Sequence, residues 1–198
     1  MDEEKKGFGA FLSKNFDAIS KLFVYHIAMC VFGLVVVLAV QMLTEQLKGD
    51  REIPLGIPAY IASVVAILVY LGLIYVCMWE KGASDRIKIL GGRMKRNNFK
   101  GLLFWLVANS IDILIIFCVT ILSFIPKAEG AHSIFLLGSL LLNAMYQPIL
   151  VAISNISWLY FIVLIPGAVM ALVSYILGVS GYKCIFPEPK GERNRKLK

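Results

Sequence analysis

The stretch GLLFWLVANSIDILIIFCVTILSFI, residues 101–125, decides the fold class of this chain. Asp112 is its only charged side chain. About twenty apolar residues in a helix, rising about 1.5 Å each, cross a bilayer core of about 30 Å. The stretch is therefore predicted to span a membrane, with Asp112 near mid-depth.

Asp112 is also the first candidate for a functional residue. An ionised carboxylate at that depth costs about 2.5 to 3.5 kcal/mol, so we expect it to be protonated, paired or in contact with water. A polar stripe follows the same helical face at 100° per residue: Trp105, Asn109, Asp112, Ile116, Thr120 and Ser123. Such a stripe lines a water-filled ion pathway or binds polar groups of neighbouring helices.

Two residues on other segments bear on Asp112. Tyr70, on the predicted second span, lies at a depth similar to Asn109 and is the first candidate partner of the carboxylate. If Asp112 is only structural, we expect a protonated acid hydrogen-bonded to Asn109 or Tyr70. His26 lies about one turn inside the first predicted span, which places it too near the cytoplasmic surface to touch Asp112.

The rest of the chain agrees with an all-α, polytopic membrane protein. Hydrophobic residues make up 59% of it, above the roughly 45 to 50% typical of soluble domains. Further spans are predicted at residues 22–43, 58–79 and 158–181, and residues 1–21 form a cytoplasmic interfacial segment. The acidic start and the long first apolar run argue against a cleavable signal. We expect a single membrane domain over residues 1–198.

The number of spans depends on residues 131–182, which carry no Asp, Glu, Lys or Arg. We favour four full spans plus a re-entrant or interfacial hairpin at residues 133–153, broken at Asn143, Tyr146, Gln147 and Pro148. Seventeen of the twenty basic residues then lie on the cytoplasmic side, with both termini, as the positive-inside rule predicts for a plasma (inner) membrane protein. Five full spans are the alternative.

Small residues recur at helical spacing on two spans. They are Gly167, Ala171, Ser174 and Gly178 on the last span, and Ala59, Ala62, Ser63 and Ala66 on the second. Such rows let helix backbones approach closely in lipid. They are expected to form helix contacts within one chain or between copies.

Two basic segments are expected in the cytoplasm, at residues 80–100 and 183–198. Their positive charges hold the segments inside and attract anionic lipid headgroups, each worth about 1 kcal/mol. A cytosolic docking element is the alternative for the loop. The residues concerned are Arg86, Lys88, Arg93, Lys95 and Arg96. No signature of nucleic-acid binding accompanies them.

Enzyme chemistry finds no support in the sequence. No phosphate-binding loop, nucleophile elbow or HExxH motif is present. The two histidines lie far apart and the four cysteines show no CxxC spacing. We therefore expect no catalytic residues, no cofactor and no structural metal.

Two functions fit these features. The first is transport, by a small channel or transporter that assembles as an oligomer. Its ion pathway would include Asp112, Asn109, Tyr70 and Thr120. The second is a non-conducting accessory, assembly, immunity or regulatory subunit that packs against a second membrane protein. Transport is favoured because a packing subunit needs no carboxylate at mid-membrane.

Overall fold

The computed structural model describes residues 7–47, 56–125, 128–153 and 159–185. These residues form helices joined by short turns, with no strand among them, so the predicted all-helical fold is confirmed. Residues 1–6, the loop at 48–55, Lys127, Trp158 and most of the basic tail lie outside the described residues.

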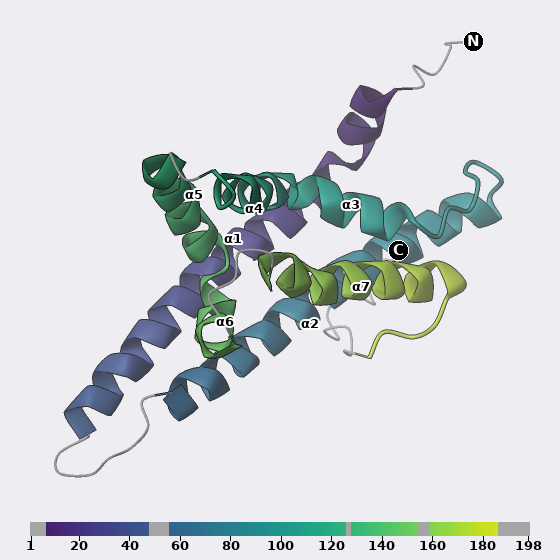
Figure 1. Ribbon diagram of the computed structural model, residues 1–198. Helices are drawn as coiled ribbons and strands as arrows, with labels where there is room; N and C mark the ends of the chain where they lie inside the picture. The colour runs from purple at the N-terminus through teal and green to yellow at the C-terminus, as the bar shows by residue number, and fades with distance from the viewer. Residues whose placement is uncertain (1–6, 48–55, 126–127, 154–158, 186–198) are drawn as a thin grey trace.

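Two long helices run side by side in opposite directions, and the shorter helices pack against them (Figure 1). Helix α1 extends over Phe8–Leu47 and α2 over Gly56–Leu90. The predicted interfacial segment and first span are thus one continuous helix. Likewise, α2 continues past the predicted span end at residue 79 through the first half of the basic segment, and stops before Gly92, whose φ of 68° favours glycine.

Among the described residues, three helices are long and apolar enough to cross a membrane: α1, α2 and α7 (Leu159–Ser180). Two bent helix pairs raise the number to five if each pair is one span. The first pair is α3 (Lys100–Ala108) with α4 (Ser110–Leu122), and the second is α5 (Glu129–Leu142) with α6 (Gln147–Ile153). The described part of the chain therefore has three to five candidate membrane-spanning helices.

The predicted single helix at residues 101–125 is wrong, because the chain bends by 64° at Asn109. The Asn109 side-chain Nδ2 donates a hydrogen bond to the Trp105 carbonyl oxygen at 2.9 Å, and the Asn109 backbone is not helical. Side chains that bond to the carbonyl four residues back bend helices. The apolar periodicity of the stretch gave no sign of this local event.

The second bend lies where the sequence predicted a polar break. Helix α5 ends before Asn143, a short 3-10 turn (η2, Ala144–Tyr146) follows, and α6 begins at Gln147, with an angle of 79° between the helices. The turn is buried against α1 and α2. At Gly33 of α1 the backbones approach so closely that an added Cβ would overlap Met145.

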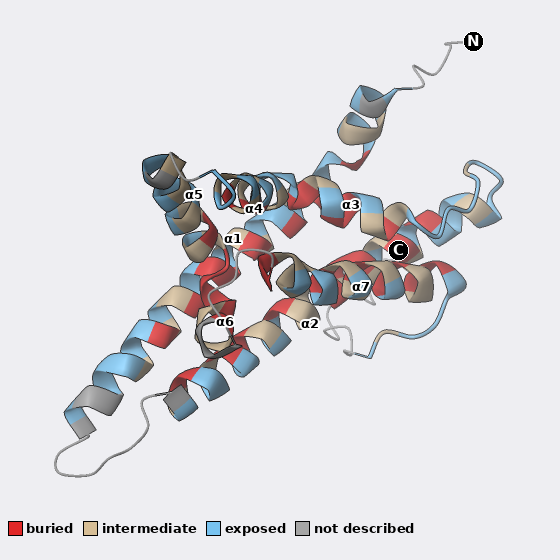
Figure 2. Cartoon of the chain, in the orientation of Figure 1, coloured by how far each residue is buried: buried red, intermediate tan, exposed pale blue. Residues whose placement is uncertain are grey.

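Helix α7 packs along α2 and α3 through its small residues. Added Cβ atoms at Gly167 and Gly178 would overlap the Trp105 side chain and the Trp79 carbonyl, respectively. Ala171 and Ser174, which lie between these two glycines on α7, are fully buried. On α2 the residues Ala59, Ser63 and Ala66 are also buried. Buried residues gather where α1, α2, α3 and α7 meet, whereas the far ends of α1 and α2 are largely exposed (Figure 2).

Candidate functional site: a buried carboxylate between two helix bends

Asp112 lies in the first turn of α4 and is 2% exposed. Its Oδ1 accepts a hydrogen bond of 2.9 Å from the Asn143 side-chain amide. Asn143 also donates to the Ser139 carbonyl oxygen at 3.2 Å, which parallels the bond of Asn109 to Trp105. Asn109 thus follows the end of α3, and Asn143 follows the end of α5. Asp112 connects the two bends, because it lies three residues after Asn109 and is hydrogen-bonded to Asn143.

His26 is the second neighbour of Asp112, contrary to the sequence prediction. Its Nε2 lies 3.8 Å from Asp112 Oδ2, and the imidazole is 3% exposed. The prediction assumed that a membrane helix begins near Leu22. Because α1 is continuous from Phe8, His26 lies eighteen residues along it, or about 27 Å at 1.5 Å per residue. That distance brings it to the middle of the bundle.

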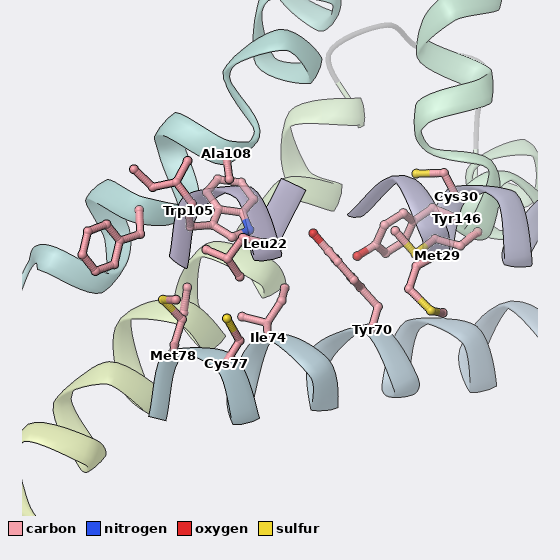
Figure 3. Packing of buried hydrophobic residues seen from close by; sticks show 14 of the residues in the cluster. Leu22, Met29, Cys30, Tyr70, Ile74, Cys77, Met78, Trp105, Ala108 and Tyr146 are labelled. Atoms are coloured by element: carbon pink, nitrogen blue, oxygen red, sulfur yellow. The ribbon is translucent and has the colours of Figure 1, made fainter. Parts of the chain in front are cut away.

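Tyr70 reaches Asp112 through His26. The Tyr70 hydroxyl and His26 Nδ1 are hydrogen-bonded at 3.1 Å. In Figure 3, Tyr70 projects from α2 into the space between Trp105 and Tyr146. A cavity of about 10 Å³ lies here, lined in part by His26, Tyr70, Trp105, Asn143 and Tyr146. A space of this size with several polar neighbours suits a single water molecule.

Within the described residues, several buried polar atoms at the two bends have no hydrogen-bond partner in the protein. They are Asp112 Oδ2, Asn109 Oδ1, Asn143 Oδ1 and Ser139 Oγ. A polar network that serves only to hold helices together is stable when every member is satisfied, because each unsatisfied buried group costs about 1 to 3 kcal/mol. A bound water molecule would satisfy such atoms.

We use the name central polar cluster for His26, Tyr70, Asp112 and Asn143, which the contacts above link to one another. Of the four residues predicted to form an ion pathway, Asp112 and Tyr70 belong to it. The side chains of Asn109 and Thr120 each donate a hydrogen bond to the carbonyl oxygen four residues back, in Trp105 and Ile116, at 2.9 Å. Two other residues of the predicted polar stripe differ in their exposure: Ile116 is buried, whereas Ser123 is exposed.

A second buried carboxylate, Asp85, was not anticipated as buried. It is 1% exposed and lies in the part of α2 that the sequence predicted as a loop. Its Oδ2 accepts hydrogen bonds from Lys100 Nζ at 2.6 Å and from the Tyr175 hydroxyl at 2.9 Å. Lys81 and Lys88 each approach Oδ1 to 3.7 Å. We call these five residues the Asp85 cluster; it ties α2, α3 and α7 together.

The basic residues predicted to contact headgroups or a partner are exposed. They are Arg86, Lys88, Arg93, Lys95 and Arg96. Two of them also have partners inside the chain. Lys88 approaches Asp85, and Arg96 donates hydrogen bonds to Asn98 Oδ1 and to the Ser180 hydroxyl. The surface they form lies around the end of α2 and the start of α3.

Sequence reasoning missed His26 and Asn143 as neighbours of Asp112. The sequence did point to Asn143 as a polar residue of interest, since it is the first residue of the polar break in an otherwise apolar segment. No signal existed for His26, because its depth depends on where α1 begins. For Asp85, the spacing to Lys81 and Lys88 at four and three residues was a usable sign of a helical ion-pair cluster.

The central polar cluster contains three kinds of proton-carrying group, namely a carboxyl, an imidazole and a phenol. Over the described part of the chain, no group of three or more His, Cys, Asp or Glu side chains is placed to hold a metal ion. An imidazole with one nitrogen facing a carboxylate and the other facing a phenol can take up a proton on one side and release it on the other.

Comparison with known proteins assigns no family: the chain matches no protein-family model, no curated protein and no solved structure.

Proposed function

We propose that this protein is a small membrane transporter or channel, and that Asp112 and His26 form its proton site. The observation that carries the proposal is the position of Asp112. It is buried at the point where two bent helix pairs meet, bonded to the asparagine of the second bend and 3.8 Å from an imidazole. Transporters commonly place ion sites at such breaks near the membrane midplane.

Movement of a proton at this site would follow the distances between the groups. A proton on His26 Nε2 has Asp112 Oδ2 as its nearest carboxylate acceptor, at 3.8 Å. That separation is too long for a hydrogen bond, so a small movement of the helices or one water molecule must complete the connection. Neutralising Asp112 also weakens its bond to Asn143, because a carboxylate accepts a stronger hydrogen bond than a neutral acid does. Protonation is thereby linked to the bend between α5 and α6.

The test is proton flux into liposomes that contain the purified protein, driven by a potassium gradient with valinomycin and followed with a pH-sensitive dye. We expect clear flux from the native protein. Asp112→Asn should reduce it to the level of empty liposomes, because the amide cannot carry the proton. Asp17→Asn is the matched control, since Asp17 is an exposed carboxylate that pairs with Lys21 at 3.0 Å.

Two results would count against transport. Native flux in the Asp112→Asn protein would exclude the proton role of that residue. Absence of flux in the native protein, together with a second protein that co-purifies in stoichiometric amount, would favour the accessory subunit. Native mass spectrometry in mild detergent measures both that partner and the number of copies in the homo-oligomer that we propose.

The proposed topology has four full spans, the α5–α6 pair as a re-entrant hairpin, and both termini in the cytoplasm of the plasma membrane. The buried 3-10 turn supports the hairpin, since irregular backbone at membrane depth is tolerated where protein surrounds it. Cys184, after α7, reports on the side of the C-terminus.

A membrane-impermeant maleimide should label Cys184 only after the cells are permeabilised. Cys118→Ser removes the other partly exposed thiol, and Cys30 and Cys77 are buried. Labelling of intact cells would instead favour five full spans with the C-terminus outside.

A further inference from the structure

A second, larger cavity lies apart from the central polar cluster. It is open on one side, has a volume of about 470 Å³ and is lined by α1, α2, α5 and α6, with Leu38, Leu137 and Leu141 of its lining about half-exposed. Small-molecule sites commonly have volumes of about 300 to 1,000 Å³. Gln41 and Tyr60 line it near the adjoining ends of α1 and α2, which the proposed topology places on the outer side.

The lining of this cavity restricts what it can bind. None of the described residues that line it is charged. Three carry neutral hydrogen-bonding groups (Gln41, Tyr60 and Gln147), and the others are apolar, among them Leu137, Leu141 and Pro148. A charged ligand would lose its hydration there without gaining a counter-charge. A largely apolar, uncharged molecule with one or two neutral polar groups would be complementary.

The cavity also adjoins the bend that Asp112 contacts. Leu141 lies two residues before Asn143, and Gln147 lies four residues after it. Both line the cavity, one on α5 and one on α6. A change in the angle between these two helices would therefore alter the shape of the cavity. Asn143, whose amide binds Asp112, is where that change would originate.

We infer that this cavity binds an uncharged, mainly apolar small molecule, and that this molecule is the transported substrate. The role as a transport substrate rests on the proposed function, whereas binding does not. Access is from the outer ends of α1 and α2. Gln41, Tyr60 and Gln147 orient the ligand through its neutral polar groups, and the leucines supply the apolar contact.

The test uses N-phenyl-1-naphthylamine, an uncharged aromatic amine that has one N–H group and fluoresces in apolar sites. The protein is held in lipid nanodiscs, and the signal of empty nanodiscs is subtracted. We expect saturable binding. The control ligand is 1-anilinonaphthalene-8-sulfonate, which adds a negative charge to the same frame and should not bind in the cavity, so any signal from its binding to the basic surface should be unchanged by substitutions in the cavity. Binding of the sulfonate in the cavity with equal affinity would contradict the inference, as would a signal no greater than that of empty nanodiscs.

Substitutions inside and outside the cavity test whether the probe binds there. Leu141→Trp places an indole in the cavity and should weaken binding about tenfold or more. Leu68→Trp, at an exposed position of α2 outside the cavity, should not change it. Gln147→Leu keeps a similar size and should weaken binding about fivefold, the equivalent of one neutral hydrogen bond. Unchanged binding in both cavity variants would place the probe elsewhere and overturn the inference.

Two further outcomes separate this inference from the proposed function. Retained probe binding in Asp112→Asn without proton flux is expected, because Asp112 does not line the cavity. Proton flux with no probe binding would overturn the cavity site alone. A phospholipid that occupies the site and is not displaced by the probe, detected by native mass spectrometry, would identify a structural lipid and would also overturn it.

Discussion

Removal of the hydroxyl that binds Asp85 should destabilise, by a measurable amount, the part of the bundle where α2, α3 and α7 meet. Tyr175 is fully buried, and its hydroxyl donates to Asp85 Oδ2 at 2.9 Å. A hydrogen bond to a charged group contributes about 1.5 to 3 kcal/mol. Tyr175→Phe keeps the ring packed on Phe104, so we expect a loss of unfolding free energy in that range.

The lysines around Asp85 provide an internal comparison of buried and exposed ion pairs. Lys100→Met removes a 2.6 Å charge-assisted bond from a side chain that is 12% exposed, so the loss should again be about 1.5 to 3 kcal/mol. Lys88→Met removes a 3.7 Å contact from a side chain that is 45% exposed, and exposed pairs contribute about 0 to 1 kcal/mol.

The assay for these three variants is reversible unfolding in mixed micelles, by titration with sodium dodecyl sulfate and followed by circular dichroism. Because Tyr175 and Lys100 bind the same oxygen, the double variant should depart from the sum of the single effects. The reasoning is refuted if Lys88→Met costs as much as Lys100→Met, or if Tyr175→Phe costs less than about 0.5 kcal/mol, below the usual range.

Two other substitutions test the packing of α7 and of the segment that follows it. Gly178→Ala should cost about 1 to 3 kcal/mol in the same unfolding assay, because its Cβ would overlap the Trp79 carbonyl. Gly138→Ala, whose Cβ would meet only Ile115 at 3.8 Å, should be close to neutral, and equal effects would contradict the packing argument. Trp79→Phe removes the hydrogen bond of 3.0 Å to the Tyr182 carbonyl oxygen, so trypsin should cleave after Lys183 about fivefold faster, and an unchanged rate would show that this bond does not hold the segment.

The short helix-breaking elements of this chain show where sequence reasoning succeeds. The break after Asn143 was predictable because several polar residues and a proline interrupt an apolar run, and such a cluster ends a helix in any context. The bend at Asn109 was not, because a single asparagine within an apolar helix either continues it or bends it. Its bond to the Trp105 carbonyl decides the outcome, and that choice depends on the surrounding packing.

By itself, the sequence determined the class of the protein and the approximate places of its apolar helices. Long uncharged runs favour apolar helices that are able to cross a membrane, and this preference depends on composition alone. It also singled out Asp112, since a lone carboxylate in such a run is conspicuous. Tertiary structure alone decided the surroundings of Asp112. The continuity of α1 sets the depth of His26, and the α5–α6 bend brings in Asn143, because contacts between distant segments depend on how helices start, bend and cross.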